Sequence, residues 1–397
     1  MGDPSSRTAA AGLLIALLLP PGPDAAHEPT QEAQAVRAAA GPTHVIVWRE
    51  PGRYGGWPAN HGIWSWGDEI LVGFSAGYMQ AAPIAAGGPA RHPIDRSRPE
   101  QHLLARSLDG GQTWRVEHNS GLIPPPRVGH MAGVPTEQGG REERPFPGAA
   151  DLSDPGFLMT FRMGDINKGP SWFFTSSDRG RSWQGPWTFP RLDLPGIAAR
   201  TDYIVYGPRE ALVFMSAAKS NGREGRPFVS KTTDGARTFT FLSWIGPEPD
   251  EGFVIMPSTV RLPGGTLVTA TRRQTPEGRG IDIHRSRDGA ASWTFVTTAV
   301  ADTGRGNPPS LIRLRDGRLA LTYGVRGEPY GIRARISADG GSSWLPERVL
   351  RGDASDWDLG YTRSVQRADG KVVTVYYYND ARGPERYIAA TIWDPDR

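Results

Sequence analysis

Arginine, histidine, tyrosine and carboxylate side chains gather in short segments of this sequence that lie between apolar runs. Three of these segments are Asn60-His61-Gly62, Arg200-Thr201-Asp202 and Tyr361-Thr362-Arg363. A guanidinium group binds a carboxylate through two parallel hydrogen bonds, and histidine, tyrosine and carboxylates transfer protons in catalysis. If the fold brings these segments together, they form a pocket for an anionic ligand rich in hydroxyl groups.

A repeat centred on Asp-Gly turns indicates which elements position these segments. Its best-formed copy runs from Ser107 to Trp114, and further copies begin at Ser176, Thr232, Ser286 and Ser337, between 51 and 69 residues apart. The Asp carboxylate of such a turn accepts hydrogen bonds from turn amides, and the following Gly takes the positive φ angle. Five copies in register predict an array of similar supersecondary units.

A second repeat of apolar runs joined by tight turns alternates with the first. It predicts six hairpins, at Ile63–Phe74, Leu152–Phe161, Tyr203–Phe214, Thr259–Ala270, Leu311–Tyr323 and Ser364–Tyr376. Each hairpin and the Asp-containing turn that follows it supply the four strands of one unit. The last unit ends at Tyr387–Trp393 without an outer strand, and His44–Trp48 has no partner of its own. We therefore expect an all-β, six-bladed β-propeller in which the N-terminal strand closes the last blade.

The order of strands in such blades assigns the turns to two faces. The Asp-containing turns lie on one face, where we expect them to be structural. The segments that lead into each blade and the loops between second and third strands lie on the other. The polar segments named above belong to this second face, which we predict to be functional.

Bulk properties limit the kinds of partner. The 397 residues carry a net charge of only +3 and no basic run, so nucleic-acid binding is not expected. Arg7, the apolar run 9–19 and the prolines after it predict a signal peptide over residues 1–26, followed by a disordered leader over 27–42 and a catalytic domain over 43–397. We expect an exported, periplasmic or extracellular monomer with no membrane span and, because it has no cysteine, no disulfide.

The five turns resemble the Asp box of the sialidase (neuraminidase) superfamily, whose BNR-repeat members are β-propellers. The resemblance extends from about residue 44 to the C-terminus. It implies an exo-acting glycoside hydrolase that releases a terminal acidic sugar, such as sialic acid, from glycans. In sialidases, three arginines clamp the sugar carboxylate, a tyrosine paired with a glutamate is the nucleophile, and an aspartate of the first blade is the acid/base.

The resemblance carries over to particular residues. The segment Gly360–Val365 looks like the one that bears the nucleophile, which implies Tyr361, with Asp358 just before it as a substrate-binding residue. Asp95, in the long loop of the first blade, has the expected position of the acid/base. The second and third clamp arginines correspond to Arg272 or Arg273 and to Arg326 or Arg333. Each of these residues has a plainer alternative, as a pocket-lining aromatic or a solvated charge.

Two departures from the sialidase pattern affect specificity. The chain has Asn60-His61-Gly62-Ile63 where sialidases have an Arg-Ile-Pro sequence, so the first clamp arginine is missing. Met256-Pro257-Ser258 stands where the glutamate partner of the tyrosine is expected. Two pairs of the third blade, Arg200 with Asp202 and Glu224 with Arg226, are predicted to bind substrate in place of the lost groups.

His61 indicates functions other than that of a sialidase. A histidine leading into a blade can be a general acid/base, and related propellers that act on uronate polysaccharides rely on histidine with tyrosine or arginine. The chain therefore also fits a uronate-polysaccharide hydrolase or lyase using His61 and Tyr361, or a non-catalytic carbohydrate-binding propeller. His61 is alternatively a packing residue within Trp57–Trp66. No residue spacing indicates a metal site, and no cofactor is expected.

Overall fold

The computed structural model describes residues 41–80, 91–118, 121–126 and 136–397, together with Met1. Residues Pro42–Arg397 form one compact unit. The predicted signal peptide and most of the predicted leader lie outside the described residues, as does the polar segment 127–130 that was expected to lead into the second blade.

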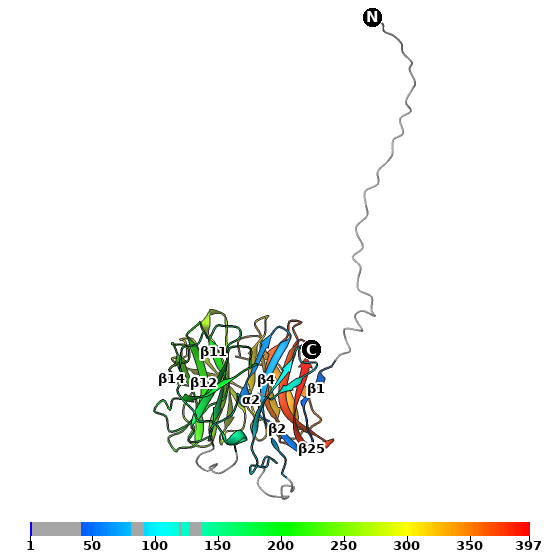
Figure 1. Cartoon of the computed structure of the whole chain (residues 1–397). Helices are drawn as coiled ribbons and strands as arrows, with labels where there is room; N and C mark the ends of the chain where they lie inside the picture. Colours follow the sequence, from blue (N-terminus) through cyan, green and yellow to red (C-terminus); the bar gives the residue numbers. More distant parts are fainter. Residues whose placement is uncertain (2–40, 81–90, 119–120, 127–135) are drawn as a thin grey trace, which may run out of the picture. The chain divides into compact units, whose positions relative to one another are not determined.

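The regular structure is almost entirely β-strand and forms five hydrogen-bonded sheets in the described part of the chain (Figure 1). The largest sheet contains β1 (Thr43–Trp48), β2 (Arg53–Gly56), β3 (Ile63–Trp66), β4 (Glu69–Tyr78), β5 (Gln101–Ser107), β6 (Arg115–Glu117), β23 (Gly360–Gln366), β24 (Val372–Asp380) and β25 (Gly383–Trp393). A three-stranded sheet contains β7 (Leu158–Met163), β8 (Ser171–Ser176) and β9 (Gln184–Phe189). A five-stranded sheet contains β10 (Ile197–Ala198), β11 (Tyr203–Val205), β12 (Ala211–Ala218), β13 (Glu224–Thr232) and β14 (Thr240–Trp244).

Two four-stranded sheets complete the set. One contains β15 (Phe253–Arg261), β16 (Leu267–Gln274), β17 (Ile281–Ser286) and β18 (Thr294–Val300), and the other β19 (Ser310–Arg313), β20 (Leu319–Val325), β21 (Gly331–Ser337) and β22 (Arg348–Arg351). Short helical segments are α2 (Pro58–His61), η2 (Glu137–Gly139) and η3 (Pro263–Gly265). None of the helices in the described ranges has the length and apolar character needed to cross a membrane.

Each predicted Asp-containing turn joins the two strands at one edge of a sheet, from β5 and β6 in the first copy to β21 and β22 in the last. Around Asp339, Oδ1 accepts hydrogen bonds from Ser337 Oγ (2.8 Å) and Ser343 N (2.9 Å), and Oδ2 accepts one from Ser343 Oγ (2.6 Å). Ser337 Oγ in turn accepts a bond from Gly341 N (2.9 Å). The other four turns repeat the bond from a serine or threonine hydroxyl to Asp Oδ2. The Asp-containing turns are thus stabilised by hydrogen bonds from their own side chains, as predicted.

Five of the six predicted hairpins are present, and the one predicted over Leu152–Phe161 is wrong. There the chain makes consecutive turns instead of a first strand, and β7 begins only at Leu158. Asp151 Oδ1 accepts a hydrogen bond from Ser153 N (2.9 Å), and Asp154 Oδ1 accepts one from Gly156 N (2.7 Å). These side-chain bonds favour turns over a strand at this position.

The first and last strands of the compact unit pair with each other. β1 is antiparallel to β25, with His44 opposite Thr391, as was expected of His44–Trp48. β2, which was not predicted, is antiparallel to β4 and also meets β25 where Tyr54 lies opposite Arg386. In Figure 1 the blue N-terminal strands accordingly lie beside red β25, and the C-terminus is next to β1.

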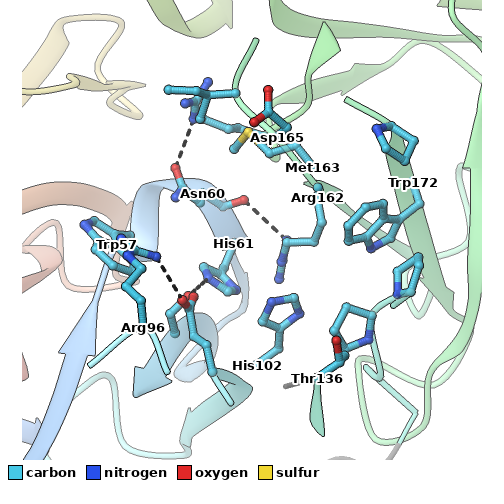
Figure 2. A pocket seen from close by; sticks show the side chains of 18 of the residues that line it. Trp57, Asn60, His61, Arg96, His102, Thr136, Arg162, Met163, Asp165 and Trp172 are labelled. Carbon is cyan, nitrogen blue, oxygen red and sulfur yellow. Dashed lines mark hydrogen bonds and ion pairs between the residues drawn. The ribbon is translucent and has the colours of Figure 1, made fainter. Parts of the chain in front are cut away.

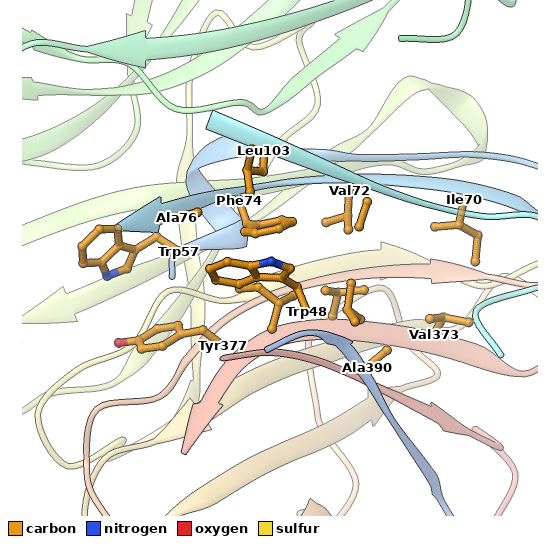
Figure 3. Close-up of a cluster of buried hydrophobic side chains, with 14 of the residues drawn as sticks. Trp48, Trp57, Ile70, Val72, Phe74, Ala76, Leu103, Val373, Tyr377 and Ala390 are labelled. Atoms are coloured by element: carbon orange, nitrogen blue, oxygen red, sulfur yellow. The ribbon is translucent and has the colours of Figure 1, made fainter. Parts of the chain in front are cut away.

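A shared hydrophobic core supports this junction. Side chains of β4, including Val72 and Phe74, face those of β24 and β25 (Figure 3). Trp48 of β1 packs between them, with its ring 5.4 Å from that of Phe74. Burying side chains of this size contributes about 1.5–3 kcal/mol each, so the junction is strongly favoured.

The Asp-containing turns and the polar segments lie at opposite ends of the strands. In β16 and β17, Leu267 pairs with Ser286, which begins an Asp-containing turn, whereas Arg272 pairs with Ile281 near the other end. The predicted separation of structural turns from the polar face therefore holds in this sheet.

Replacing Asp339 with alanine should destabilise the fold in a pH-dependent way. Hydrogen bonds from Ser343 and Ser337 lower the pKa of Asp339 to about 2, with burial opposing them. Because this folded-state pKa is below the ordinary value of 3.8, the stabilisation is present at neutral pH and is lost as the pH falls toward 2. We expect the free energy of unfolding of Asp339→Ala to be lower by about 1 kcal/mol at neutral pH. Urea denaturation should show this difference shrinking near pH 2; a constant difference would contradict the assignment.

Candidate active site

Tyr361 lies at the start of β23 in a strained backbone conformation. Its φ angle is 52°, in the left-handed region, which costs about 1–3 kcal/mol for a residue other than glycine. Asn307 holds this conformation, because its Oδ1 accepts a hydrogen bond from Tyr361 N (2.9 Å) and its Nδ2 donates one to Leu359 O (2.9 Å). A Cβ at Gly360 would lie 2.2 Å from Asn307 Nδ2, so glycine is required there. Such strain is typical of functional positions.

Arginines from two neighbouring sheets surround the Tyr361 ring. Arg272, near the end of β16, points Nη1 at the Tyr361 hydroxyl, with a long contact of 3.5 Å. The Arg326 guanidinium, just after β20, lies 5.4 Å from the centre of the Tyr361 ring. Burial lowers the pKa of Arg272. The interactions of Arg272 with Tyr361 and Glu224 raise its pKa, whereas those with the cations Arg326 and Arg200 lower it further. These five residues therefore form one electrostatic cluster.

Arg200 reaches the same cluster from the third sheet with a carboxylate partner. Its Nη1 donates to Glu224 Oε1 (2.5 Å), and its Nε donates to Asn60 Oδ1 (3.2 Å). Burial tends to lower the pKa of Arg200, but the charge and hydrogen bond of Glu224 and the charge of Tyr361 raise it. Arg200 and Glu224, which were both predicted to bind substrate, are thus brought together with Tyr361. They pair with each other and not with the partners named in the prediction.

A buried carboxylate organises the other side of the site. Asp358 is fully buried and accepts hydrogen bonds from Tyr377 OH (2.6 Å) and Arg386 Nε (3.1 Å). His92 Nδ1 lies 2.6 Å from its Oδ1. Burial would raise the pKa of Asp358, but His92, Arg386 and Arg326 lower it to about 2. Tyr377 also accepts a hydrogen bond from Arg326 Nη2 (2.5 Å), so Asp358 positions both Arg326 and His92.

Two cavities share His92 as a lining residue. The first, of about 660 Å³, is lined by Tyr361 and Arg200 together with proline side chains, and by His61, Trp57 and Trp172, which Figure 2 labels. The second, of about 730 Å³, is lined by Arg272 and Arg326. Both volumes are in the range of small-molecule sites, about 300–1,000 Å³.

His61 ends α2 and is almost completely buried in the wall of the first cavity. Its Nε2 lies 2.9 Å from Ser75 Oγ, and its Nδ1 has no hydrogen-bond partner. Gly73 leaves room for it, since a Cβ there would come within 2.7 Å of His61 Cβ. Burial lowers the pKa of His61 well below 6.5, and the charges of Arg162 and His102 act in the same direction. The imidazole is therefore neutral at neutral pH.

Comparisons with known proteins agree with this architecture. The family described as BNR repeat-like domain matches residues 157–374, more than half of the 397-residue chain. The chain belongs to this family. None of the curated proteins compared with the sequence matches it.

Solved structures share the fold of this BNR repeat-like protein at low sequence identity. A protein of unknown function from Dyadobacter fermentans has a TM-score of 0.64 and 21% identity, over 89% of this chain and 99% of that one. The NanB sialidase of Streptococcus pneumoniae has a TM-score of 0.58 and 11% identity, over 88% and 70%. The α-L-arabinanase of Penicillium chrysogenum in complex with arabinobiose has 0.54 and 13%, over 89% and 98%. The predicted resemblance to the sialidase-like propeller superfamily is confirmed at the level of fold.

Several predicted residues of the BNR repeat-like protein lie outside the two cavities. Arg226 packs 4.3 Å from the centre of the Trp244 ring and donates to Gly246 O (3.2 Å). Arg333 donates to the carbonyls of Arg351 (3.1 Å) and Pro329 (2.9 Å). Of the two alternatives for the third clamp position, Arg326 and not Arg333 therefore lines a cavity.

The remaining predicted carboxylates are also engaged elsewhere. Asp95 Oδ1 accepts hydrogen bonds from Ser97 N (2.9 Å) and Ser97 Oγ (2.6 Å), in a local turn outside both cavities. Asp202 lies 3.6 Å from Arg363 Nη1. Burial raises the pKa of Asp202 to about 7, although Arg363 and Thr259 oppose the shift. Arg273 forms an ion pair with Asp282 (2.8 Å). Of the two alternatives for the second clamp position, Arg272 is therefore the one that lines a cavity.

Three residues that line the first cavity, His92, Glu100 and Arg162, were not among the site residues predicted from the sequence. His92 and Glu100 belong to the same first-blade loop as Asp95, which offers no periodicity to choose among them. Arg162 lies near the end of β7, much as Arg272 lies near the end of β16. That shared place in the repeat could have singled it out. Within the described ranges, no group of three or more His, Asp or Glu side chains is arranged to hold a metal ion.

Replacing Asp358 with alanine should destabilise this protein strongly. The change leaves Arg386 without its buried partner, and breaking a buried ion pair costs about 3–5 kcal/mol. The matched control is Asp356→Ala, because Asp356 also pairs with Arg386 (2.8 Å) but is 39% exposed. We expect a loss of about 1 kcal/mol or less for the control. Urea denaturation at neutral pH measures both, and equal losses would contradict the role assigned to Asp358.

Proposed function

We propose that this protein is an exo-acting glycoside hydrolase of the sialidase type, which releases a terminal acidic sugar from glycans. One observation carries the proposal: Arg272 and Arg326 flank Tyr361 and form no ion pair with any carboxylate of the described residues. Two buried guanidinium groups without a carboxylate form a suitable clamp for the carboxylate of a sugar. Arg200, which pairs with Glu224, is proposed to stand in for the missing first clamp arginine.

The sheet topology supports a six-bladed propeller as the scaffold. The nine-stranded sheet divides naturally into two blades, one of β3 to β6 and one of β23 to β25 with β1. Together with the four other sheets, this division gives six blades. β2 then bridges the first and last blades, and the pairing of β1 with β25 closes the ring.

The proposed mechanism uses Tyr361 as nucleophile. Its oxygen attacks the anomeric carbon as a basic group takes the phenol proton and the glycosidic bond breaks, and an acidic group on the cavity wall protonates the leaving oxygen. Water then releases the sugar and restores the phenol. A neutral phenol suits an anionic sugar, because a carboxylate nucleophile would be repelled. His92 and Glu100 are better placed than Asp95 to supply the proton, since both line the cavity that Tyr361 lines.

A uronate-polysaccharide hydrolase or lyase is the alternative. It is favoured by His61, a neutral and buried imidazole whose Nδ1 has no partner and which lines the same cavity as Tyr361. In a lyase, a base removes the proton next to the uronate carboxylate, the bond to the leaving oxygen breaks, the leaving oxygen takes up a proton, and a carbon–carbon double bond remains. The arginines would neutralise the carboxylate during this step.

The site of action is proposed from the sequence. A predicted signal peptide at residues 1–26 supports export to the periplasm or the extracellular space. An exported monomer would meet polymeric glycans there, which fits an open cavity on one face.

Replacing Tyr361 with phenylalanine should abolish turnover and preserve binding. Removal of a nucleophile lowers kcat by about a thousandfold or more, whereas the lost hydroxyl should weaken binding by less than about tenfold. Release of a fluorescent aglycone from sialyl and uronyl glycosides measures turnover. Tyr78→Phe is the control, because Tyr78 lies outside both cavities at the end of β4.

The same assay separates the alternatives. Turnover that survives Tyr361→Phe but is lost in His61→Ala, with a product that absorbs in the near ultraviolet, would favour the lyase. Glycan binding without turnover on any of these substrates would leave a carbohydrate-binding propeller and contradict the proposed enzyme.

Arg272→Met should lower activity on acidic sugars selectively. Loss of a charge-assisted hydrogen bond costs about 1.5–3 kcal/mol, which corresponds to roughly a ten- to hundredfold fall in kcat/KM. Arg273→Met is the matched control, because its guanidinium faces Asp282 and not a cavity. Activity on a neutral arabinofuranoside, if present, should be unchanged in both variants. Equal effects of the two substitutions on the acidic substrate would contradict the clamp.

A further inference from the structure

Arg162 is a buried cation in the wall of the first cavity that the proposed mechanism does not use. It is only 5% exposed. Its Nη1 donates to Thr160 Oγ1 (2.5 Å) and Phe161 O (2.7 Å) and makes longer contacts with Asn60 O (3.3 Å) and Thr201 Oγ1 (3.4 Å). Its Nε has no hydrogen-bond partner. It forms no ion pair with any carboxylate in the described part of the chain.

Such an arrangement is costly unless something else compensates the charge. Burial lowers the pKa of Arg162 to about 9, with Glu100 opposing the shift, so the group is still a cation at neutral pH. A buried cation without a paired anion destabilises a fold by several kcal/mol. The position therefore has the character of a binding site and not of a structural ion pair.

The acidic side chains of the same cavity are already engaged. Glu100 lies 3.7 Å from Arg96 Nη1, and Asp165 Oδ1 accepts hydrogen bonds from the amides of Asn167 (2.7 Å) and Lys168 (2.8 Å). Neither of them is within ion-pair distance of Arg162.

Two imidazole rings instead lie beside Arg162. Figure 2 shows the side chains of His61, His102 and Arg162 turned toward one another, and the two imidazole rings meet edge to face at 5.2 Å. His61 Nδ1 has no partner here. Trp57 and Trp172 also line this cavity and offer apolar walls to a sugar ring.

We propose that Arg162, with His61 beside it, forms a second anion subsite, which binds a sulfate ester or carboxylate on the sugar next to the one held at Tyr361. This inference rests on the proposed function for the position of the two sugars. Two of the three clamp arginines, Arg272 and Arg326, line the other cavity, whereas Tyr361, Arg200 and Arg162 line this one. The first cavity therefore takes the leaving-group side of the glycan. The preferred substrate class is a glycan with acidic groups on two adjacent sugars.

The test measures anion binding, which needs no turnover. All variants carry Arg272→Met, which weakens anion binding at the clamp to the same extent in each of them. Thermal unfolding is then followed in increasing sodium sulfate or sodium acetate at constant ionic strength. Specific binding raises Tm in a saturable manner, whereas the general effect of sulfate on stability does not saturate. Adding Arg162→Met should weaken the saturable component at least tenfold. Adding Arg287→Met, which removes an exposed arginine of an Asp-containing turn, should leave it unchanged.

The two salts distinguish the two sources of charge. A saturable shift with sulfate indicates a sulfate ester subsite, and one with acetate a carboxylate subsite. No saturable shift with either salt in the Arg272→Met protein, or an equal shift after Arg162→Met, would overturn the proposal. Failure of all glycosides in the turnover assay would instead overturn only the proposed reaction.

A ligand-free measurement separates binding from a structural role. Because Arg162 has no paired anion, Arg162→Met should leave Tm unchanged or raise it, whereas loss of a structural arginine would lower it. If the methionine variant does not unfold cooperatively, Arg162→Lys replaces it. Lysine keeps the charge but lacks the planar fork, so its saturable component should again be at least tenfold weaker, and retention of wild-type affinity would count against the subsite.

Discussion

The buried carboxylate of Asp358 holds together groups from both ends of the compact unit. Tyr54 of β2 and Arg386 of β25 both contact it, and His92 approaches it from the loop before β5. An ionised carboxylate is stable away from water only where donors satisfy its oxygens. These segments therefore have to assemble together, and Tyr377 extends the same requirement to Arg326. The arrangement of the site is thus tied to the folding of the chain around it.

Positive charge is the dominant electrostatic property of the site. Arg162, Arg272 and Arg326 are buried and lack carboxylate partners among the described residues, whereas Arg200 has Glu224. Like charges in a poorly solvated region repel one another strongly. The protein accepts this cost where an anionic ligand would remove it, and stability and binding therefore place opposite demands on the same side chains.

Much of the fold could be predicted because its signals are local and repeated. The Asp-containing turns and five hairpins are each specified by a few neighbouring residues. The site depends instead on which side chain at a strand end faces the cavity. Arg272 and Arg273 are neighbours in β16, and successive side chains of a strand point to opposite faces, so one lines a cavity and the other pairs with Asp282. His92 could not be distinguished from Asp95, because both lie in a loop without periodicity.

The pairing of β1 with β25 has a consequence for how the protein is made. His44 Nδ1 and Thr391 Oγ1 lie 3.0 Å apart, although 347 residues separate them in the chain. A growing polypeptide cannot form this contact until almost all of it has left the ribosome, and closing so long a loop slows folding. A fragment cut short before residue 383 would leave the β1 edge open to pairing with a second fragment. Synthesis of full-length chains is thus itself a safeguard against aggregation.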